Sequence, residues 1–444
     1  MAGMTKKATL LILGGASDLA RRLLIPGAAN FLAVHPEAEI DIVGVGTTPQ
    51  EDYPGFIRSA VQESELVEDE SVGERLAKNS RFIEADATDD KELARVIGEA
   101  NPETRLVIYC ALPPSVAGST IDALCSVELP VGTVLAIEKP IGTDAPSAAD
   151  VEKRALKVVD ESHLYRVDHF LQQSAVSSLI GLLALNRPLL DSFRAESVES
   201  VDFVYEETLA LEGRAGFYDS TGATRDMHQS HLIQVVMHIL AVGGDESVAD
   251  LLEHASADPA NARRGQYTAG EIDGHRVPAY TDEEGIDESS TTETLSQVQI
   301  DIDTDRWRGV PVRLRSGKAF GTERKDLTIT YLPSDVADGP RTRIVITFDD
   351  VLHIQMHVTA GLGVEKHEPL EAVAELHEGH LSPYARVVRA LVAGDHRREV
   401  PAGTAARAWE VLQPVLDAFD NDEVELEKYP AGSDTFDQWS PPGE

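Results

Sequence analysis

The sequence predicts an α/β plus α+β protein with two domains: a doubly wound parallel sheet over residues 1–165, and a domain over residues 166–444 built on a large, mostly antiparallel sheet covered by helices. Two observations support this prediction. In the first part, short apolar runs alternate with amphipathic stretches, which is typical of right-handed β-α-β crossovers. From about residue 197 the apolar residues recur at period two, which indicates strands with one covered face.

The N-terminal strands are predicted from five apolar runs, with a helical pattern between each run and the next. These runs cover residues 8–13, 40–45, 81–85, 106–112 and 134–137. A further short strand is expected within residues 163–170, ending in the polar residues Asp168 and His169. Because parallel strands joined by helices are covered on both faces, their continuous apolar character fits this part of the chain.

The C-terminal strands are predicted from longer alternating runs at residues 197–208, 295–302, 326–331, 342–348 and 352–358. Residues 383–391 and 404–419 carry apolar side chains at helical spacing, and we expect packing helices there. Residues 247–290 are polar and rich in Gly, Pro and Asp. We expect loops and short helices in that region.

Composition excludes several classes of partner. The 444 residues include 76 acidic and 39 basic ones, and a net charge of −37 argues against binding to nucleic acid or to an anionic membrane. No run of about twenty apolar residues occurs, and Lys6 and Lys7 lead into a strand without a signal-peptide pattern. Cys110 and Cys125 make neither a disulfide framework nor a metal-binding spacing. We therefore expect a cytoplasmic protein.

A glycine-rich turn follows the first predicted strand and points to a dinucleotide. Gly14 and Gly15 permit a tight turn, and Ser17, Asp18 and Leu19 open the next helix. The N-terminus of a helix in this position receives a pyrophosphate in Rossmann-like folds.

An acid–base constellation lies in the second predicted domain. A glycine-rich segment at residues 213–219 precedes a predicted helix that carries Asp226 and His231. An imidazole accepts a proton near neutral pH, and a carboxylate beside it fixes its tautomer, so this pattern indicates a general base for an alcohol. His228, His231 and His238 also share this helix, but no cysteine or acidic triad completes a metal site, and we expect no metal.

Many blocks of this chain resemble, in order, those of the glucose-6-phosphate dehydrogenase family. Residues 166–170 read Arg-Val-Asp-His-Phe where the family has Arg-Ile-Asp-His-Tyr, and residues 225–231 match its Arg-Asp-x-x-Gln-Asn-His block with one change. Residues 212–218 resemble its Glu-Gly-Arg-Gly-Gly-Tyr block. Further matching blocks lie at residues 111–116, 138–142, 264–267, 292–294, 310–318 and 429–433.

The resemblance implies oxidation of the anomeric carbon of an aldose, glucose 6-phosphate being the expected substrate, to a lactone, with hydride transfer to NAD or NADP. It implies a homodimer whose antiparallel sheets meet across a two-fold axis. His231 would be the base and Asp168 its carboxylate partner, while Lys139 would contact both substrate and nicotinamide. The implied sugar and phosphate ligands are His169, Gln173, Glu212, Asp226, Arg313 and Lys318. Thr47, Pro113 and Pro114 would join the glycine-rich turn at the cofactor, with the prolines against the adenine.

Two departures from the family pattern concern the cofactor. Ser17 stands where the family usually has glycine, and Thr47 stands where it commonly has an arginine for the 2′-phosphate of NADP. An Asp or Glu at that strand end would indicate a preference for NAD, but neither residue stands there. Arg21 and Arg22 are near enough in sequence to contact a 2′-phosphate, so we expect use of NAD or of both cofactors.

Two further departures concern the substrate. Phe170 replaces a tyrosine, and Gln173 replaces a lysine that would supply charge to the substrate phosphate. A neutral amide makes weaker hydrogen bonds than a charged group. Two alternatives follow: a dehydrogenase of a free or differently substituted hexose, and a non-catalytic regulatory paralogue.

Overall fold

The computed structural model describes residues 7–211, 215–334, 340–348, 352–360, 368–376 and 381–433. The chain divides into two compact units. The first comprises Met1–Ser174 and Gly379–Ala406, and the second Ala175–Glu378 and Arg407–Glu444. Among the helices of these described stretches, none combines the length and apolar character needed to cross a bilayer.

The first unit is built on a six-stranded sheet in the order β3-β2-β1-β4-β5-β6, in which every neighbouring pair is parallel. Its strands are β1 (Lys7–Leu13), β2 (Glu39–Gly46), β3 (Ser80–Glu84), β4 (Arg105–Cys110), β5 (Val134–Ile137) and β6 (Leu164–Arg166). The chain order reverses beside β1, and ligands of such open sheets bind at this switch point. The predicted doubly wound sheet is confirmed.

The helices of the first unit alternate with its strands, as the pattern predicts. They are a π-helix at Ala20–Leu24, α1 (Ile25–Val34), α2 (Tyr53–Glu63), α3 (Glu70–Lys78), α4 (Asp90–Gly98), α5 (Pro114–Leu124) and α6 (Ala145–Val158). Asp52, Asp69, Asp89 and Asp144 begin four of them, each accepting a backbone N–H of the first turn. Such caps satisfy donors that a helix leaves unpaired at its start.

A later helix, α12 (Pro383–Ala393), also belongs to the first unit. Its buried residues join the same apolar core as those of α1. Gly27 of α1 makes this close packing possible, since a Cβ there would lie 2.7 Å from Cβ of Tyr384. The helix predicted at residues 383–391 is therefore confirmed, and it packs on the same apolar core as the parallel sheet.

The second unit contains a nine-stranded sheet in the order β16-β15-β14-β13-β7-β12-β11-β8-β17. Its strands are β7 (Val198–Glu206), β8 (Ala255–Thr268), β11 (Leu295–Ile302), β12 (Val312–Gly317), β13 (Arg324–Tyr331), β14 (Arg343–Thr347), β15 (Leu352–Ala360), β16 (Glu368–Leu376) and β17 (Leu426–Pro430). Only β12–β7 and β17–β8 pair in parallel among these described strands. The predicted large, mostly antiparallel sheet is confirmed. A small antiparallel hairpin, β9 (Gly270–Ile272) with β10 (His275–Val277), follows β8 in the chain.

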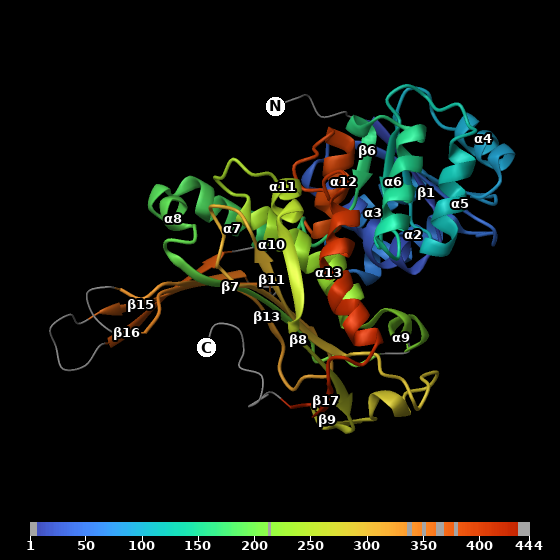
Figure 1. Ribbon diagram of the computed structural model, residues 1–444. Helices are drawn as coiled ribbons and strands as arrows, with labels where there is room; N and C mark the ends of the chain where they lie inside the picture. Colours follow the sequence, from blue (N-terminus) through green and yellow to red (C-terminus); the bar gives the residue numbers. More distant parts are fainter. Residues whose placement is uncertain are drawn as a thin grey trace. The chain divides into compact units, whose positions relative to one another are not determined.

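Helices cover this large sheet. They are α7 (Ser174–Leu185), α8 (Arg187–Ser192), α9 (Ala215–Ala223), a π-helix at Thr224–Leu232, α10 (Ile233–Leu240), α11 (Val248–Glu253) and α13 (Thr404–Asp420). In Figure 1, α10 and α13 lie along one face of the sheet, and β15 with β16 forms its outer hairpin. The guanidinium of Arg264 on β8 stacks 5.3 Å from the ring centroid of Phe419 on α13.

Two sequence expectations for this unit are wrong. The region expected as loops and short helices contains β8, a 14-residue strand paired with both β11 and β17. Its alternating residues are alanines and polar side chains, which are weak strand signals on their own, so pairing on both edges decides the structure. The glycine-rich segment was expected to be irregular throughout, but α9 begins at Ala215, while Glu212, Gly213 and Arg214 lie outside the described residues.

Prediction: Gly27→Ala destabilises the protein by about 1–3 kcal/mol, because the added methyl group must displace the α12 backbone at Tyr384. The control is Gly98→Ala at the end of α4, where a Cβ meets nothing within 4 Å. That change should be neutral or stabilise by up to about 1 kcal/mol. Thermal unfolding of both variants measures the difference, and equal stabilities would contradict the packing of α1 on α12.

Candidate active site

The turn after β1 is one that a side chain would obstruct. Gly14 has φ +88°, and a Cβ there would lie 2.3 Å from the Ala111 carbonyl oxygen. A Cβ on Gly15 would lie 2.3 Å from Cα of Gly44. Both backbone N–H groups donate to the carbonyl of Val45, at 2.9 Å each. These contacts bring the end of β1 tightly against β2, as the predicted role of the two glycines requires.

A pocket of about 590 Å³ opens at the carboxyl ends of β1, β2 and β3. It has the size and position of a nucleotide site in a doubly wound sheet. Its lining residues are Gly14, Ala16, Ser17, Val45, Gly46, Thr47, Thr48, Gln50, Phe82, Ala85, Asp86, Ala87, Thr88, Leu112 and Val116. The sequence-predicted Gly14, Ser17 and Thr47 therefore share one pocket; Gly15, Asp18, Leu19, Pro113 and Pro114 adjoin these lining residues in the chain.

Sequence reasoning missed the pocket residues after β3. Asp86 accepts hydrogen bonds from the backbone N–H and the hydroxyl of Thr88, at 2.8 and 2.7 Å, and these bonds lower the pKa of its carboxyl group. The position could have been found, because Asp86 directly follows the strand predicted at residues 81–85 and strands of this kind present ligand residues at their carboxyl ends.

The arginines expected near the adenosine phosphate have other partners. Arg21 donates to both carboxylate oxygens of Glu63, at 2.7 and 2.9 Å, and to the hydroxyl of Ser59. Arg22 is exposed and lies 3.5 Å from Asp18. The side chains that line the pocket, within the described parts of the chain, include a carboxylate but no lysine or arginine.

A buried ion pair forms at the carboxyl ends of β5 and β6. The register pairs Ile137 with Arg166, so Lys139 and Asp168 each lie two residues beyond a paired position. Lys139 Nζ lies 3.0 Å from Asp168 Oδ1, and the two side chains are 8% and 0% exposed. The carboxylate also accepts the backbone N–H of Phe170 at 2.9 Å. This pairing keeps a carboxylate charged where an unpaired acid would be protonated.

A second carboxyl group is buried beside this pair. Glu138 accepts hydrogen bonds from the hydroxyls of Tyr109 and Tyr384, the latter at 3.2 Å, and burial raises the pKa of its carboxyl group. The ring of His169 stacks on Tyr384 with centroids 5.4 Å apart. The same helix, α12, therefore supports both Glu138 and the histidine that follows Asp168.

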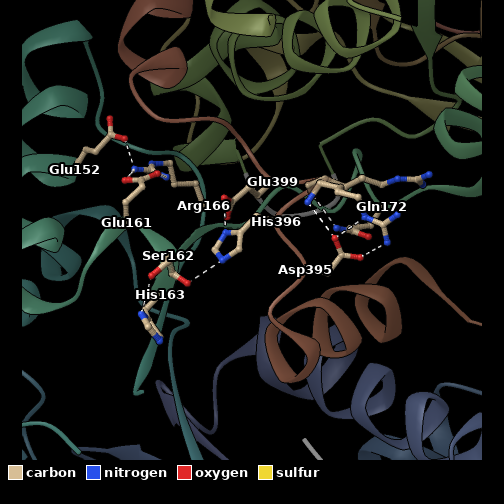
Figure 2. A network of polar contacts seen from close by, with 11 residues as sticks. Glu152, Glu161, Ser162, His163, Arg166, Gln172, Asp395, His396 and Glu399 are labelled. Carbon is tan, nitrogen blue, oxygen red and sulfur yellow. Dashed lines mark hydrogen bonds and ion pairs between the residues drawn. The ribbon is translucent and has the colours of Figure 1, made fainter. Parts of the chain in front are cut away.

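A polar network around Arg166 holds β6, the strand that ends two residues before Asp168 (Figure 2). Arg166 is fully buried and donates to Glu161 through two bonds of 2.9 Å, and it also pairs with Glu152. Its carbonyl accepts the backbone N–H of Val400 at 3.0 Å. A buried guanidinium needs such bidentate, charge-assisted bonds, so the network fixes β6.

The same network holds a histidine–carboxylate pair (Figure 2). His396 Nδ1 lies 2.7 Å from Glu399 Oε1, and its Nε2 lies 3.0 Å from the carbonyl of Ser162. A carbonyl only accepts, so Nε2 carries a proton and donates it to Ser162. Burial raises the pKa of Glu399 to about 7.

Gln173 belongs to the first unit, where its backbone N–H donates to the carbonyl of Phe170 at 3.1 Å. The second unit holds the other sequence-predicted residues that the structure describes. Arg313 on β12 pairs with the buried Asp202 at 2.6 Å, and Lys318 pairs with Glu207 at 2.7 Å. The parallel register of β7 and β12 explains both pairs, because it aligns Arg313 with Asp202 and Gly317 with Glu206. Both cations thus already have a carboxylate partner, and Arg313 and Lys318 are held at separate points along the strand pair.

Asp226 and His231 lie on the π-helix between α9 and α10, and both are partly exposed. The helix start is fixed by Glu293, which accepts the backbone N–H of Thr224 at 2.9 Å. π-Helical turns are rare and occur often at functional sites. His228 is fully buried, and burial lowers the pKa of its imidazole to about 3, so it is neutral at physiological pH.

Comparison with known proteins shows the class to which this fold and these residues belong. The model of the glucose-6-phosphate dehydrogenase NAD-binding domain matches residues 11–178, and that of the family's C-terminal domain matches residues 183–440. The chain belongs to the glucose-6-phosphate dehydrogenase family.

Individual relatives match over nearly the whole chain. Glucose-6-phosphate 1-dehydrogenase of Gluconobacter oxydans is 29% identical over 466 aligned positions, covering 95% of this chain and 93% of its own. The crystal structure of glucose-6-phosphate 1-dehydrogenase from Mycobacterium avium superposes with a TM-score of 0.83 at 27% identity, covering 97% of this chain and 95% of its own. A glucose-6-phosphate dehydrogenase in complex with glucose 6-phosphate shares the fold with a TM-score of 0.86 at 23% identity, covering 98% and 97%.

Prediction: Glu399→Gln gains stability relative to the wild type as the pH rises. The raised pKa means that the folded state holds the Glu399 proton more tightly than the unfolded state, so the wild type loses stability as the pH rises from the ordinary value of 4.5 through about 7. The glutamine variant has no such loss. Thermal unfolding at pH 5 and pH 8 measures the difference.

The control for this prediction is Glu37→Gln, since Glu37 and His35 form a histidine–carboxylate pair with a longer separation of 3.4 Å and a half-exposed carboxyl group. Surface pairs of this kind contribute little, so the control should follow the wild type at both pH values. If Glu399→Gln also follows the wild type, the buried carboxyl group does not titrate as described.

Proposed function

We propose that this chain oxidises C1 of glucose 6-phosphate to a lactone and transfers the hydride to a nicotinamide dinucleotide. The observation that carries the proposal is the buried Lys139–Asp168 pair at the carboxyl edge of the parallel sheet, in a chain of this family. Relatives matched over nearly their full length are named glucose-6-phosphate 1-dehydrogenases, which supports this substrate and reaction. We also propose a cytoplasmic homodimer, for which the family resemblance is the support.

The reaction needs a base, because the C1 hydroxyl must lose its proton as the C1 hydrogen leaves as hydride. We assign the base to His231 and its carboxylate partner to Asp168. An imidazole titrates ordinarily near pH 6.5, which suits a base at neutral pH. The charge of Asp168 stabilises the imidazolium that forms, and Lys139 keeps that carboxylate ionised and oriented in the first unit. A bound nicotinamide dinucleotide supplies the hydride acceptor.

The remaining side chains are assigned to the sugar and its phosphate. Glu212 and Asp226 accept from sugar hydroxyls, and His169 and Gln173 serve the phosphate end. Arg313 and Lys318 are held by Asp202 and Glu207, at 2.6 and 2.7 Å. They bring positive charge to the substrate only if the substrate competes with these carboxylates. Because Arg313 is bound to a fully buried aspartate, Lys318 is the better placed of the two to turn toward a ligand.

We propose that the cofactor is NAD, or NAD and NADP both. Gly14, Gly15, Ser17, Asp18 and Leu19 form the turn and helix start that receive the pyrophosphate, with Thr47 at the adenosine end and Pro113 and Pro114 near the adenine. Three observations support a slight preference for NAD over NADP, which carries the 2′-phosphate. Thr47 carries no charge, Arg21 is engaged by Glu63, and Asp86 lines the pocket. A carboxylate repels a phosphate and accepts from hydroxyl groups.

Prediction: His231→Asn lowers kcat for glucose 6-phosphate oxidation by a factor of about 10²–10⁴, because the general base is lost. The KM for the cofactor should change little, since the first unit is untouched. His254→Asn is the control, a histidine at the end of α11 that contacts the carbonyl of Asp250. Steady-state kinetics by absorbance of the reduced nicotinamide measures both.

Undiminished turnover by His231→Asn would overturn the assignment of the base. Glucose and glucose 6-phosphate are compared in the same assay. Equal efficiency with both sugars would favour the free-hexose alternative, and no turnover of either by the wild type would favour the regulatory one.

Prediction: Thr47→Arg raises the kcat/KM ratio of NADP over NAD by about tenfold, because a guanidinium in the pocket can bind a 2′-phosphate through charge-assisted bonds. Ser126→Arg adds the same charge after α5, away from the pocket lining, and should leave the ratio unchanged. An unchanged ratio in Thr47→Arg would show that position 47 does not face the adenosine ribose.

A further inference from the structure

Four arginines lie together at the C-terminal part of the first unit. Arg386 and Arg389 are one turn apart on α12, and Arg397 and Arg398 follow in the segment after that helix. We call these four residues the arginine cluster. In a chain with a net charge of −37, such a local concentration of cations is unusual.

The arginine cluster packs on the segment that continues from Asp168 and His169. Arg386 donates to the carbonyl of Gln172 at 2.8 Å and to the hydroxyl of Ser174 at 2.5 Å. Gln172 in turn donates from Nε2 to the carbonyl of Arg398 at 2.7 Å. Figure 2 shows Gln172 and Asp395 together at one side of the Arg166 network. The cluster is thus fixed to residues 172–174 at two points.

Asp395 and Glu399 are the carboxyl groups of the described segment that carries Arg397 and Arg398. Asp395 accepts from Arg397 at 2.8 and 2.6 Å, and this pairing lowers the pKa of its carboxyl group to about 2. Glu399, the next carboxyl group along the chain, is bound to His396 instead. Both carboxyl groups of this described segment, Asp395 and Glu399, therefore already have a partner.

Arg398 is the member whose charge is least compensated. Its side chain is partly buried, and within the described stretches of the chain its guanidinium makes no hydrogen bond or ion pair. Burial and the charges of Arg386, Arg397 and Arg389 lower the pKa of this guanidinium, while Asp395 acts in the opposite direction. A bound anion would supply charge-assisted hydrogen bonds to this partly buried guanidinium.

We propose that the arginine cluster is a binding site for a phosphate dianion, with Arg398 as its principal ligand. A phosphate monoester carries nearly two negative charges and three acceptor oxygens at neutral pH, and a guanidinium binds two of these oxygens at once. The uncompensated charge of the cluster matches such a dianion. A polyanion such as nucleic acid fits less well, because the acidic surface of the chain repels it.

The dianion has two possible sources, the phosphate of the sugar substrate and free inorganic phosphate. The sugar source rests on the proposed function and follows from position, because the cluster holds residues 172–174 just beyond His169. The free-phosphate source does not depend on that function. Binding of inorganic phosphate is therefore measured first, by the rise in Tm that phosphate causes in the whole protein at low ionic strength.

The experiment compares the wild type, Arg398→Gln, Arg398→Lys and a control, Arg95→Gln. Arg95 lies on α4 and is half-exposed in a pair with Glu99. Arg398→Gln should weaken phosphate binding on the order of tenfold, the size expected for a lost charge-assisted bond. Arg398→Lys should be intermediate, since it keeps the charge but not the planar fork. Arg95→Gln should match the wild type.

The KM for glucose 6-phosphate separates the two sources. A rise in KM in Arg398→Gln, together with the weakened phosphate response, supports the site and assigns it to the substrate. A weakened response with an unchanged KM supports the site and assigns it to free phosphate. An undiminished phosphate response in Arg398→Gln overturns the proposal, and so does a wild type that does not respond to phosphate at all.

These outcomes do not depend on turnover, so loss of the proposed oxidation would leave the phosphate measurement intact. If Arg398→Gln fails to fold, the exposed Arg389→Gln replaces it, because that side chain adds charge to the same cluster from the surface of α12. A smaller but measurable weakening is then expected, and no change would again overturn the proposal.

Discussion

The ion pair between Lys139 and Asp168 is the constraint on which the rest of the candidate site depends. Two charges are almost fully removed from water at the carboxyl edge of the sheet, and loss of either would leave the other uncompensated. The parallel register of β5 and β6 places them opposite each other, and Arg166 below them fixes β6 through bonds to Glu161. The register of these two strands thus places a carboxylate paired with a lysine at the edge of the sheet where such folds bind ligands.

The distribution of charge bears on how so acidic a chain would bind the phosphorylated substrate that we propose. In the second unit the two predicted substrate cations, Arg313 and Lys318, are held by carboxylates. In the first unit the arginine cluster brings four cations together, and the guanidinium of Arg398 makes no hydrogen bond or ion pair with the described residues. Long-range repulsion is screened within about 8 Å at physiological salt, so such a local excess can decide binding.

Much of the fold was predictable, since the predicted strands and the two C-terminal helices follow from periodicity that the sequence displays openly. β8 was not, because its alternation runs through alanine and polar residues and its stability comes from two neighbouring strands. The positions of Gly14 and Thr47 in one pocket could be predicted, because each follows a predicted strand. The contacts of α12 with Glu138 and His169, and its part in the arginine cluster, could not be predicted. Helical periodicity identifies a helix but not the unit that the helix joins.

The most direct test of this account is the pH dependence of kcat/KM for glucose 6-phosphate in the wild type and in Asp168→Asn. If an ionised Asp168 supports an imidazole base, kcat/KM falls below a pKa near neutrality in the wild type, and removing the negative charge moves that pKa to a lower pH and reduces the plateau. A profile in Asp168→Asn with the same pKa and the same plateau as the wild type would contradict the account.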